Sequence, residues 1–304
     1  MVTVKLARCQ LVALPRPRLR TSWWRFCPHE LLMKIRTLVV LVAGGLGACR
    51  TGTNYPSERD PRYSGVAIGS AALETPDTIR IVSFNVKYAE RVDSAIIVLT
   101  TEPALRKADV MLLQEMDAQG TKRIADALGM SWVYYPAIFR HRSGKDLGNA
   151  VLSRWPITSD DKIVLPHVSR YARTQRIATA ATIRVGDVDV RAYSTHLGTP
   201  ADISSASRRA QFQAIIVDAA KHARVVIGGD TNSATVGRVA VENGFSWPTE
   251  RGEPTSRFGR WDHIFIRGFA LPAAEGAGTI ANVRAASDHL PVWALAILRT
   301  TDRE

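Results

Sequence analysis

The chain has 304 residues, of which 46% are hydrophobic and 22% are charged, and its formal net charge is +12. This composition excludes a disordered or fibrous chain and suits one large folded domain, alone or behind a leader. Residues 1–50 hold nine Lys and Arg against the single acid Glu30, so they carry +8 and leave +4 for the other 254 residues. The high charge therefore belongs mainly to the N-terminal segment and is not evidence for a nucleic-acid-binding domain.

Residues 33–49 have the layout of a bacterial export signal. Lys34 and Arg36 precede an apolar run from residue 38 to residue 46, and small residues follow. The run is shorter than the ~20 residues that a membrane-spanning helix needs. Its ending, Leu-Gly-Ala-Cys at 46–49, resembles the lipobox of bacterial lipoproteins, in which the cysteine is lipidated and becomes the mature N-terminus.

This resemblance predicts an exported protein that is anchored to the bacterial cell envelope by a lipid on Cys49. The alternatives are a simple N-terminal membrane anchor, or a cleaved secretory signal in which Cys49 has no role. Residues 1–32 show no clear periodicity, and we expect them to be a non-native extension upstream of a natural start at Met33.

The folded domain is expected at residues 77–304. Residues 50–76 are rich in Thr, Gly, Ser, Pro and Arg and lack apolar periodicity, which predicts a flexible linker. The three cysteines stand at positions 9, 27 and 49, so the expected domain contains none. A metal bound in that domain must therefore have oxygen or imidazole ligands.

Short apolar runs along the domain, many of them β-branched or aromatic, predict strands. Longer segments between the runs predict helices, and the clearest of them has Phe212 and Ile216 on one face and Asp202 as its expected N-cap. Strands that alternate with helices and also pair as hairpins indicate an α/β (α+β) architecture with mixed sheets. The expected strands cover 79–86, 109–115, 132–139, 148–153, 176–185, 188–197, 224–230, 262–268 and 289–298, and the expected helices cover 91–107, 118–129 and 202–222.

Polar residues stand where these apolar runs end or begin. Each of them alone has an ordinary explanation, because Asn and Asp commonly form turns at strand ends and a lone His is usually structural. Together they predict a hard-metal site with acid–base groups beside it, since strand ends in layered folds face the loops that build pockets. Strands end at Asn85, Glu115, His196 and Asp230, and strands begin at Asp262 and at Asp288-His289.

Seven sequence pieces occur in a characteristic order: SFNV (83–86), LLQEMD (112–117), GNAVLSRWPI (148–157), STHLGT (194–199), GGDTN (228–232), WDHIFI (261–266) and SDHLPV (287–292). Their order resembles that of the endonuclease/exonuclease/phosphatase superfamily, which includes pancreatic deoxyribonuclease, abasic-site repair endonucleases, bacterial sphingomyelinases and inositol-polyphosphate phosphatases. The resemblance covers about three quarters of the chain. It implies a four-layer sandwich of two mixed β-sheets with helices on the outside.

The resemblance also implies a metal site. Mg²⁺, for which Mn²⁺ can substitute, would be held principally by Glu115, with Asn85 and Asp288 nearby. Asn149 and Arg176 would bind substrate.

The remaining residues of the implied site would act on the water and on the phosphate. Asp230 and Asn232 would orient or activate the attacking water. His196 and His289, the latter paired with Asp262, would contact the scissile phosphate. Whether His289 acts as a base or as an electrostatic stabiliser, and whether one or two metals bind, the sequence leaves open.

The implied function is metal-dependent hydrolysis of phosphoester bonds by a monomer outside the cytoplasm, with a nuclease-like phosphodiesterase as the first hypothesis. A phospholipid or inositol-phosphate phosphoesterase is the alternative, and a surface-anchored binding module that has lost catalysis is a third hypothesis. The basic loop 139–145 could bind a second phosphate or could simply be solvated.

Overall fold

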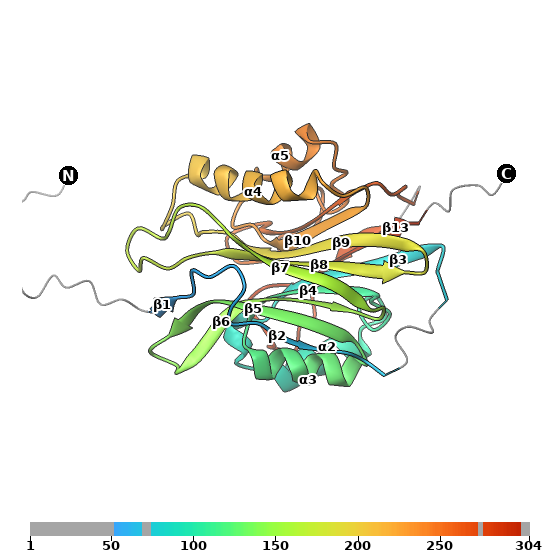
Figure 1. The fold of residues 1–304 in the computed structure, drawn as a ribbon, viewed down its shortest axis with the longest axis horizontal. Helices are drawn as coiled ribbons and strands as arrows, with labels where there is room; N and C mark the ends of the chain where they lie inside the picture. Colours follow the sequence, from blue (N-terminus) through green and yellow to red (C-terminus); the bar gives the residue numbers. More distant parts are fainter. Residues whose placement is uncertain (1–51, 69–73, 273–275, 299–304) are drawn as a thin grey trace, which may run out of the picture. The chain divides into compact units, whose positions relative to one another are not determined.

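Two β-sheets pack face to face in the computed structural model, and helices cover both outer faces (Figure 1). The chain divides into the units 1–47 and 48–304, and every described residue belongs to the second. The expected upstream extension and export signal, including Cys49, lie outside the described residues. Among the described residues, no helix has the length and apolar character needed to cross a membrane. The structure describes residues 52–68, 74–272 and 276–298.

The larger sheet is mixed and has eight strands. Its centre is a parallel pair, β3 and β4, and most of its other pairings are antiparallel. In spatial order the strands are β1 (Gly52–Asn54), β5 (Ser131–Arg140), β6 (Lys145–Ser153), β4 (Val110–Met116), β3 (Thr78–Asn85), β13 (Val292–Ile297) and β12 (Ala277–Thr279), and β2 (Tyr63–Gly65) also pairs with β5.

The smaller sheet has five strands, and its parallel pair is β9 and β10. In spatial order the strands are β11 (Asp262–Arg267), β10 (Val225–Asp230), β9 (Val188–His196), β8 (Ile177–Val185) and β7 (Ile157–Val164). The helices are η2 (Lys87–Ala89, a 3₁₀ turn), α2 (Val92–Thr101), α3 (Ala118–Leu128), α4 (Ser205–Ala219) and α5 (Gly237–Glu242). Helices α2 and α3 cover the larger sheet, and α4 and α5 cover the smaller one (Figure 1). The expected four-layer sandwich is confirmed.

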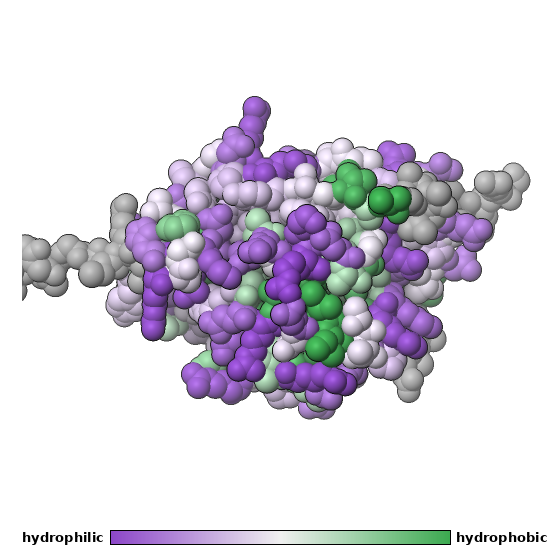
Figure 2. Space-filling view, turned by 90° about the horizontal axis from the view of Figure 1, so that it is seen from below, coloured by the Kyte–Doolittle hydropathy of each residue, from purple (hydrophilic) through white to green (hydrophobic). Residues whose placement is uncertain are grey.

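The central strands are buried on both faces, as their nearly continuous apolar sequence predicts. Ile81 and Leu112 pack between the sheets, against side chains such as Ile264 of the smaller sheet. Their neighbours Val82 and Leu113 point the other way and pack beneath α2 and α3, because successive strand residues face opposite sides. The outer face over α2 and α3 is mostly hydrophilic, with a hydrophobic area near its middle (Figure 2). This packing holds the strand ends in fixed positions.

Two of the expected helices have different ends in the structure. Helix α2 stops at Thr101 and does not reach residue 107, because the proline at position 103 disfavours a helical conformation at Glu102, whose ψ is 122°. Helix α4 begins at Ser205, and Ser204, not Asp202, is its N-cap: the Ser204 hydroxyl accepts from the backbone N–H of Ser207.

The prediction of a flexible linker at residues 50–76 is partly wrong. Its residues form the short strands β1 and β2, which pair with β5 and cover an edge that would otherwise be open. Tyr63 packs on Tyr134, with ring centroids 5.9 Å apart, and the Tyr55 hydroxyl donates to Asp146. Residues 52–68 therefore fold with the domain.

Two further strand predictions need correction. Strand β7 was not expected, because its sequence is largely polar. It lies at the edge of the smaller sheet. The last long strand begins at Val292, after Pro291, so His289 lies in the loop before β13 and not at the start of a strand.

Candidate active site

The polar strand ends of the two sheets meet at one edge of the sandwich. Because β9 and β10 are parallel and β11 runs antiparallel to β10, Asp230 lies between His196 and Asp262 in register. In the larger sheet, Asn85 stands beside Gln114 at the ends of β3 and β4. The sheets are joined at this point, since Asn85 Nδ2 donates to Asp230 Oδ2 over 3.1 Å.

Asp230 lies at the centre of the cluster and is fully enclosed. Its Oδ1 accepts from the backbone N–H of Asn232 at 2.9 Å. The preceding Gly229 allows a close approach of β10 to β9, because a Cβ there would come within 1.9 Å of the Thr195 carbonyl oxygen. Burial, and then the charge of Asp262, raise the pKa of Asp230 to about 7.

Glu115 occupies a strained position in β4. Its φ is 56°, a left-handed conformation that is rare without glycine, and the β4–β6 pairing is interrupted between Leu113 and Met116. Glu115 Oε1 accepts from Asn85 Nδ2 at 3.3 Å and Oε2 accepts from the backbone N–H of Tyr88 at 3.1 Å. Burial raises the pKa of Glu115. The strained backbone aims the carboxylate into the cluster.

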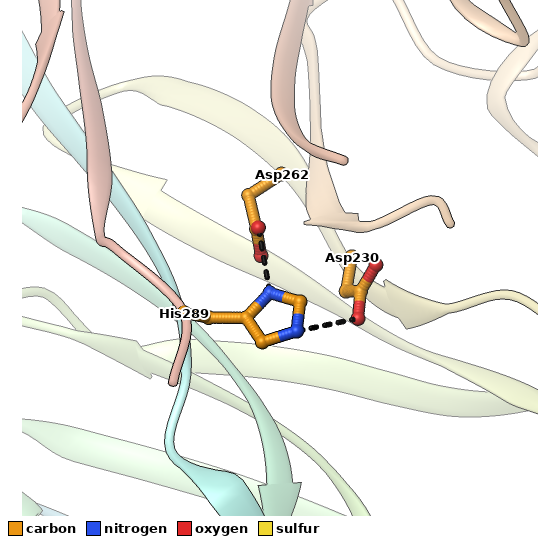
Figure 3. Close-up of side chains that lie close together, drawn as sticks. All are labelled: Asp230, Asp262 and His289. Carbon is orange, nitrogen blue, oxygen red and sulfur yellow. Dashed lines mark hydrogen bonds and ion pairs between the residues drawn. The ribbon is translucent and has the colours of Figure 1, made fainter. Parts of the chain in front are cut away.

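His289 and Asp262 form a pair across the gap between the two sheets (Figure 3). The contact is thus made from a loop of one sheet to a strand of the other. His289 Nδ1 lies 2.8 Å from Asp262 Oδ2, and Nε2 lies 3.7 Å from Asp230 Oδ2. Burial opposes the charged ring, but the hydrogen bond and charge of Asp262, with help from Asp230 and Glu115, raise the pKa of His289 to about 10.

His196 has the opposite electrostatic character. Burial, followed by the charges of Arg176 and His289, lowers the pKa of His196 well below its usual range. Arg176 Nη1 lies 3.0 Å from His196 Nδ1, and a guanidinium can only donate, so Nδ1 is the acceptor. The neutral ring therefore carries its proton on Nε2, which lies 3.4 Å from Asp230 Oδ2.

The other predicted residues are placed as follows. The side-chain amide nitrogen of Asn149 donates to the Ile177 carbonyl and ties β6 to β8, which leaves its oxygen and its second N–H for a ligand. Asn232 Nδ2 donates to the Leu197 carbonyl at 3.0 Å. Asp288 is 63% exposed at the rim, with Oδ2 at 3.7 Å from Lys87 Nζ.

Asn85 faces the carboxylates with its amide nitrogen. Its Oδ1 accepts from the backbone N–H of Lys87 at 3.0 Å, while Nδ2 donates to Glu115 and Asp230. Asn85 therefore orients these two carboxylates, and its role as a metal ligand, like that of Asp288, stays a prediction.

The donor set fits a metal ion. Ligand atoms of Asp230, Asp262 and His289 all lie within 4.8 Å of one another. Among the described residues, the buried Asp262 Oδ1 has no hydrogen-bond partner, and burial raises the pKa of both Glu115 and Asp230. A divalent cation would relieve this crowding of carboxylates. Because His289 is held in its charged form, the carboxylate oxygens are the better ligands.

A cavity of about 480 Å³ adjoins the cluster. Glu115 and His196 line it on one side, and Arg176 and Asn149, the two expected substrate-binding residues, also line it. This volume lies within the range of small-molecule sites. Substrate contact by Arg176 and Asn149 stays a prediction.

Two residues that hold the site were not anticipated. Tyr88 binds Glu115 through its backbone, in a turn with positive φ, and Thr255 Oγ1 accepts from the backbone N–H of Asp262 at 3.1 Å. Neither has a periodic or compositional signal.

The sequence profile of the Endonuclease/Exonuclease/phosphatase family matches residues 82–289. The chain belongs to the endonuclease/exonuclease/phosphatase family. The matched range contains Asn85, Glu115 and His289, which belong to the cluster described above. The search of curated proteins found no match.

Solved structures show the same fold. A family protein from Bacteroides vulgatus superposes with a TM-score of 0.59 at 16% identity, covering 74% of this chain and 100% of that one. Sphingomyelinase C from Streptomyces griseocarneus gives 0.56 at 17% identity, with coverages of 73% and 100%. D. rerio TDP2, in complex with a single-strand DNA product, gives 0.55 at 17% identity, with coverages of 73% and 99%. Identities this low establish the fold alone.

Proposed function

We propose that this chain is a metal-dependent phosphoester hydrolase of the nuclease-like phosphodiesterase type. The observation that carries the proposal is the cluster at the sandwich edge. There, the buried carboxylates of Glu115 and Asp230 lie beside the Asp262–His289 pair, next to a cavity lined by arginines. Membership of the family supports phosphoester hydrolysis as the reaction.

Glu115 would hold Mg²⁺, or Mn²⁺ in its place, with Asp288 at the rim and Asn85 orienting the Glu115 carboxylate. When bound, the ion supplies positive charge that neutralises the phosphate and the negative charge that develops on it. The test of this assignment is the metal dependence described in the Discussion.

The histidines would act on the phosphate in different ways. With a pKa of about 10, His289 is an imidazolium at neutral pH, so it would stabilise negative charge or protonate the leaving oxygen and would not act as a base. The neutral His196 would donate a hydrogen bond from Nε2 to a phosphate oxygen. Asp230, with a pKa of about 7, is suited to accept a proton from the attacking water, which Asn232 helps to orient.

The alternative is a phospholipid or inositol-phosphate phosphoesterase. The similarity to sphingomyelinase C supports it as much as the similarity to TDP2 with a DNA product supports a nuclease. We place nucleic acid first because the cavity walls are basic. A catalytically inactive binding module is disfavoured by the presence of every polar residue of the cluster.

A substrate panel tests the proposal. The protein is assayed with Mg²⁺ on plasmid DNA, RNA, sphingomyelin and a simple phosphate monoester. We expect DNA or RNA to be cleaved and Asp230→Asn to lower the rate at least ~10²-fold, since a positioned proton acceptor contributes about that much. Asp189→Asn is the matched control, because Asp189 is exposed and pairs with Arg184 at the far end of β9. Cleavage of sphingomyelin alone favours the alternative, and folded protein that cleaves nothing contradicts the proposal.

We propose further that the protein is exported and lipid-anchored through Cys49, on the support of the signal-like sequence at 33–49. Replacing Cys49 with Ala should move the protein from the membrane fraction to a soluble or unprocessed form, which cell fractionation detects. An unchanged membrane fraction would instead indicate a simple membrane anchor.

A further inference from the structure

The cavity beside the active site extends well beyond the catalytic cluster. It lies between the β5–β6 hairpin, which carries Arg140 and Arg142, and the loop that carries residues 172–176. Glu115 and His196 form the side that meets the cluster. Its volume of about 480 Å³ leaves room for a chemical group next to the reacting phosphate.

The charge of the cavity lining is strongly one-sided. Glu115 is the one acidic residue among the lining residues, and three arginines line the cavity: Arg140, Arg142 and Arg176. Within the described part of the chain, neither Arg140 nor Arg142 has an ion-pair partner, whereas Arg62 and Arg191 are paired with carboxylates. Positive charge that the protein leaves unpaired inside a cavity favours an anionic ligand.

Arg140 is held in place without a carboxylate. Its guanidinium carbon lies 3.9 Å from the centre of the Tyr88 ring, and its backbone is paired with both Gly52 of β1 and Lys145 of β6. Tyr88 is in turn fixed by its backbone bond to Glu115 Oε2. Stacking leaves the edge of a guanidinium free, and that edge matches the geometry of phosphate.

The two neighbouring basic side chains of the hairpin, His141 and Lys145, each have a partner within the protein. Lys145 Nζ lies 3.0 Å from Asp117 Oδ2, and His141 Nε2 lies 2.9 Å from Thr53 Oγ1. Of the basic residues in the loop at 139–145, Arg140, His141 and Arg142 line the cavity and Lys145 does not.

We propose that Arg140 binds a second phosphate of the substrate in this cavity, so that the site selects phosphoesters carrying a further phosphate beside the scissile one. This inference rests on the proposed function. A nucleic-acid strand carries such a phosphate on the adjoining nucleotide, and an inositol polyphosphate carries one on its ring.

Binding measurements test the inference without turnover. The full chain with Asp230→Asn is titrated calorimetrically in Mg²⁺ with thymidine 3′,5′-bisphosphate and with thymidine 5′-monophosphate. If the proposed function is right, this variant hydrolyses the ligands slowly, and if it is wrong, the ligands are not hydrolysed at all. The affinities can be measured in both cases, so failure of this inference is distinguishable from failure of the proposed function. We expect the bisphosphate to bind at least ~10-fold more tightly, as one charge-assisted hydrogen bond would provide.

Variants of Arg140 on the same background identify the residue responsible. Arg140→Gln should bring the ratio of the two affinities close to one, and Arg140→Lys should give an intermediate ratio because it keeps the charge and loses the planar stack. Arg238→Gln is the control, since Arg238 is exposed on α5 and does not line the cavity. Thermal melting verifies that each variant is folded.

A matched pair of inositol ligands, inositol 1-phosphate and inositol 1,4-bisphosphate, distinguishes the two sources of the second phosphate. A larger ratio for the thymidine pair supports nucleic acid, and a larger ratio for the inositol pair supports a lipid head group. A ratio near one for both pairs, a ratio unchanged by Arg140→Gln, or no binding of any ligand would overturn the inference.

Discussion

Left-handed backbone conformations in residues other than glycine position the Glu115 carboxylate. Lys87, Tyr88 and Ala89 have φ of 44°, 56° and 49°, and Glu115 has φ of 56°. Such conformations cost on the order of 1–3 kcal/mol each and persist where the surrounding structure enforces them. Here they turn the Tyr88 N–H toward Glu115 Oε2. The sequence singles out Glu115 as a candidate site residue but does not reveal its backbone conformation, because no glycine marks it.

His289 and Asp262 should behave as one catalytic unit. Because the pair acts on charge that develops in the transition state, His289→Ala and Asp262→Asn should each lower kcat by about 10²- to 10⁴-fold. Residues that act as a unit are not additive, so the double variant should be little worse than His289→Ala alone. The measurement is a double-mutant cycle on kcat, accompanied by thermal melts.

A purely structural role for the pair would give a different pattern. The single variants would then melt at lower temperature, and the protein that stays folded would turn over substrate at a nearly normal rate. Simple additivity of the two losses in kcat would also contradict the coupled pair.

At the scale of the elements, the sequence predicts the centre of each sheet better than its edges. Strands β3, β4 and β10 have nearly continuous apolar sequences because helices or the other sheet cover both faces. Strand β7 has three exposed polar residues, Thr158, Ser159 and Asp161, and pairs with one strand, β8. Strands β1 and β2 are three residues each and exist through pairing with β5. Edge strands of this kind depend on a partner that the local sequence does not reveal.

The site divides in the same way. The polar residues at the ends of apolar runs could be named as candidate site residues because the end of each run can be recognised in the sequence. The hydrogen-bond partners of Asp230 could not be predicted from the sequence. Its contact with Asn85 joins two sheets that pack together only in the folded molecule. For the same reason, the sequence does not reveal that the His289–Asp262 contact joins the two sheets.

The segment that carries β1 and β2 should stabilise the domain and the cavity wall. Asn54 donates to the Arg173 carbonyl and accepts from the backbone N–H of Gln175, which holds the loop at 172–176. A protein that begins at residue 77 should therefore melt at lower temperature than one that begins at residue 50, and should aggregate more through the open edge of β5. Thermal melts and size-exclusion chromatography compare the two. Equal melting temperatures would show that the segment is a tether after all.

At the scale of the whole molecule, the site exists only where the two sheets come together. Gln114, at the end of β4, donates to Ser194 of β9 over 2.9 Å, and the Ser194 hydroxyl donates back to the Leu113 carbonyl. These buried contacts fix the sheets against each other beside the cluster. Since the larger sheet supplies Glu115 and the smaller one supplies Asp230, the proposed catalysis requires precise packing of the sandwich.

The central claim is that the carboxylates at this edge hold a divalent metal and hydrolyse a phosphodiester. The most direct measurement is the rate of hydrolysis of a chromogenic phosphodiester after chelation, followed by titration with Mg²⁺ or Mn²⁺, for the native protein and for Glu115→Gln. We expect the chelator to abolish activity, either metal to restore it in the native protein, and Glu115→Gln to need far more metal and remain slow. Activity that persists undiminished in excess chelator would contradict the account.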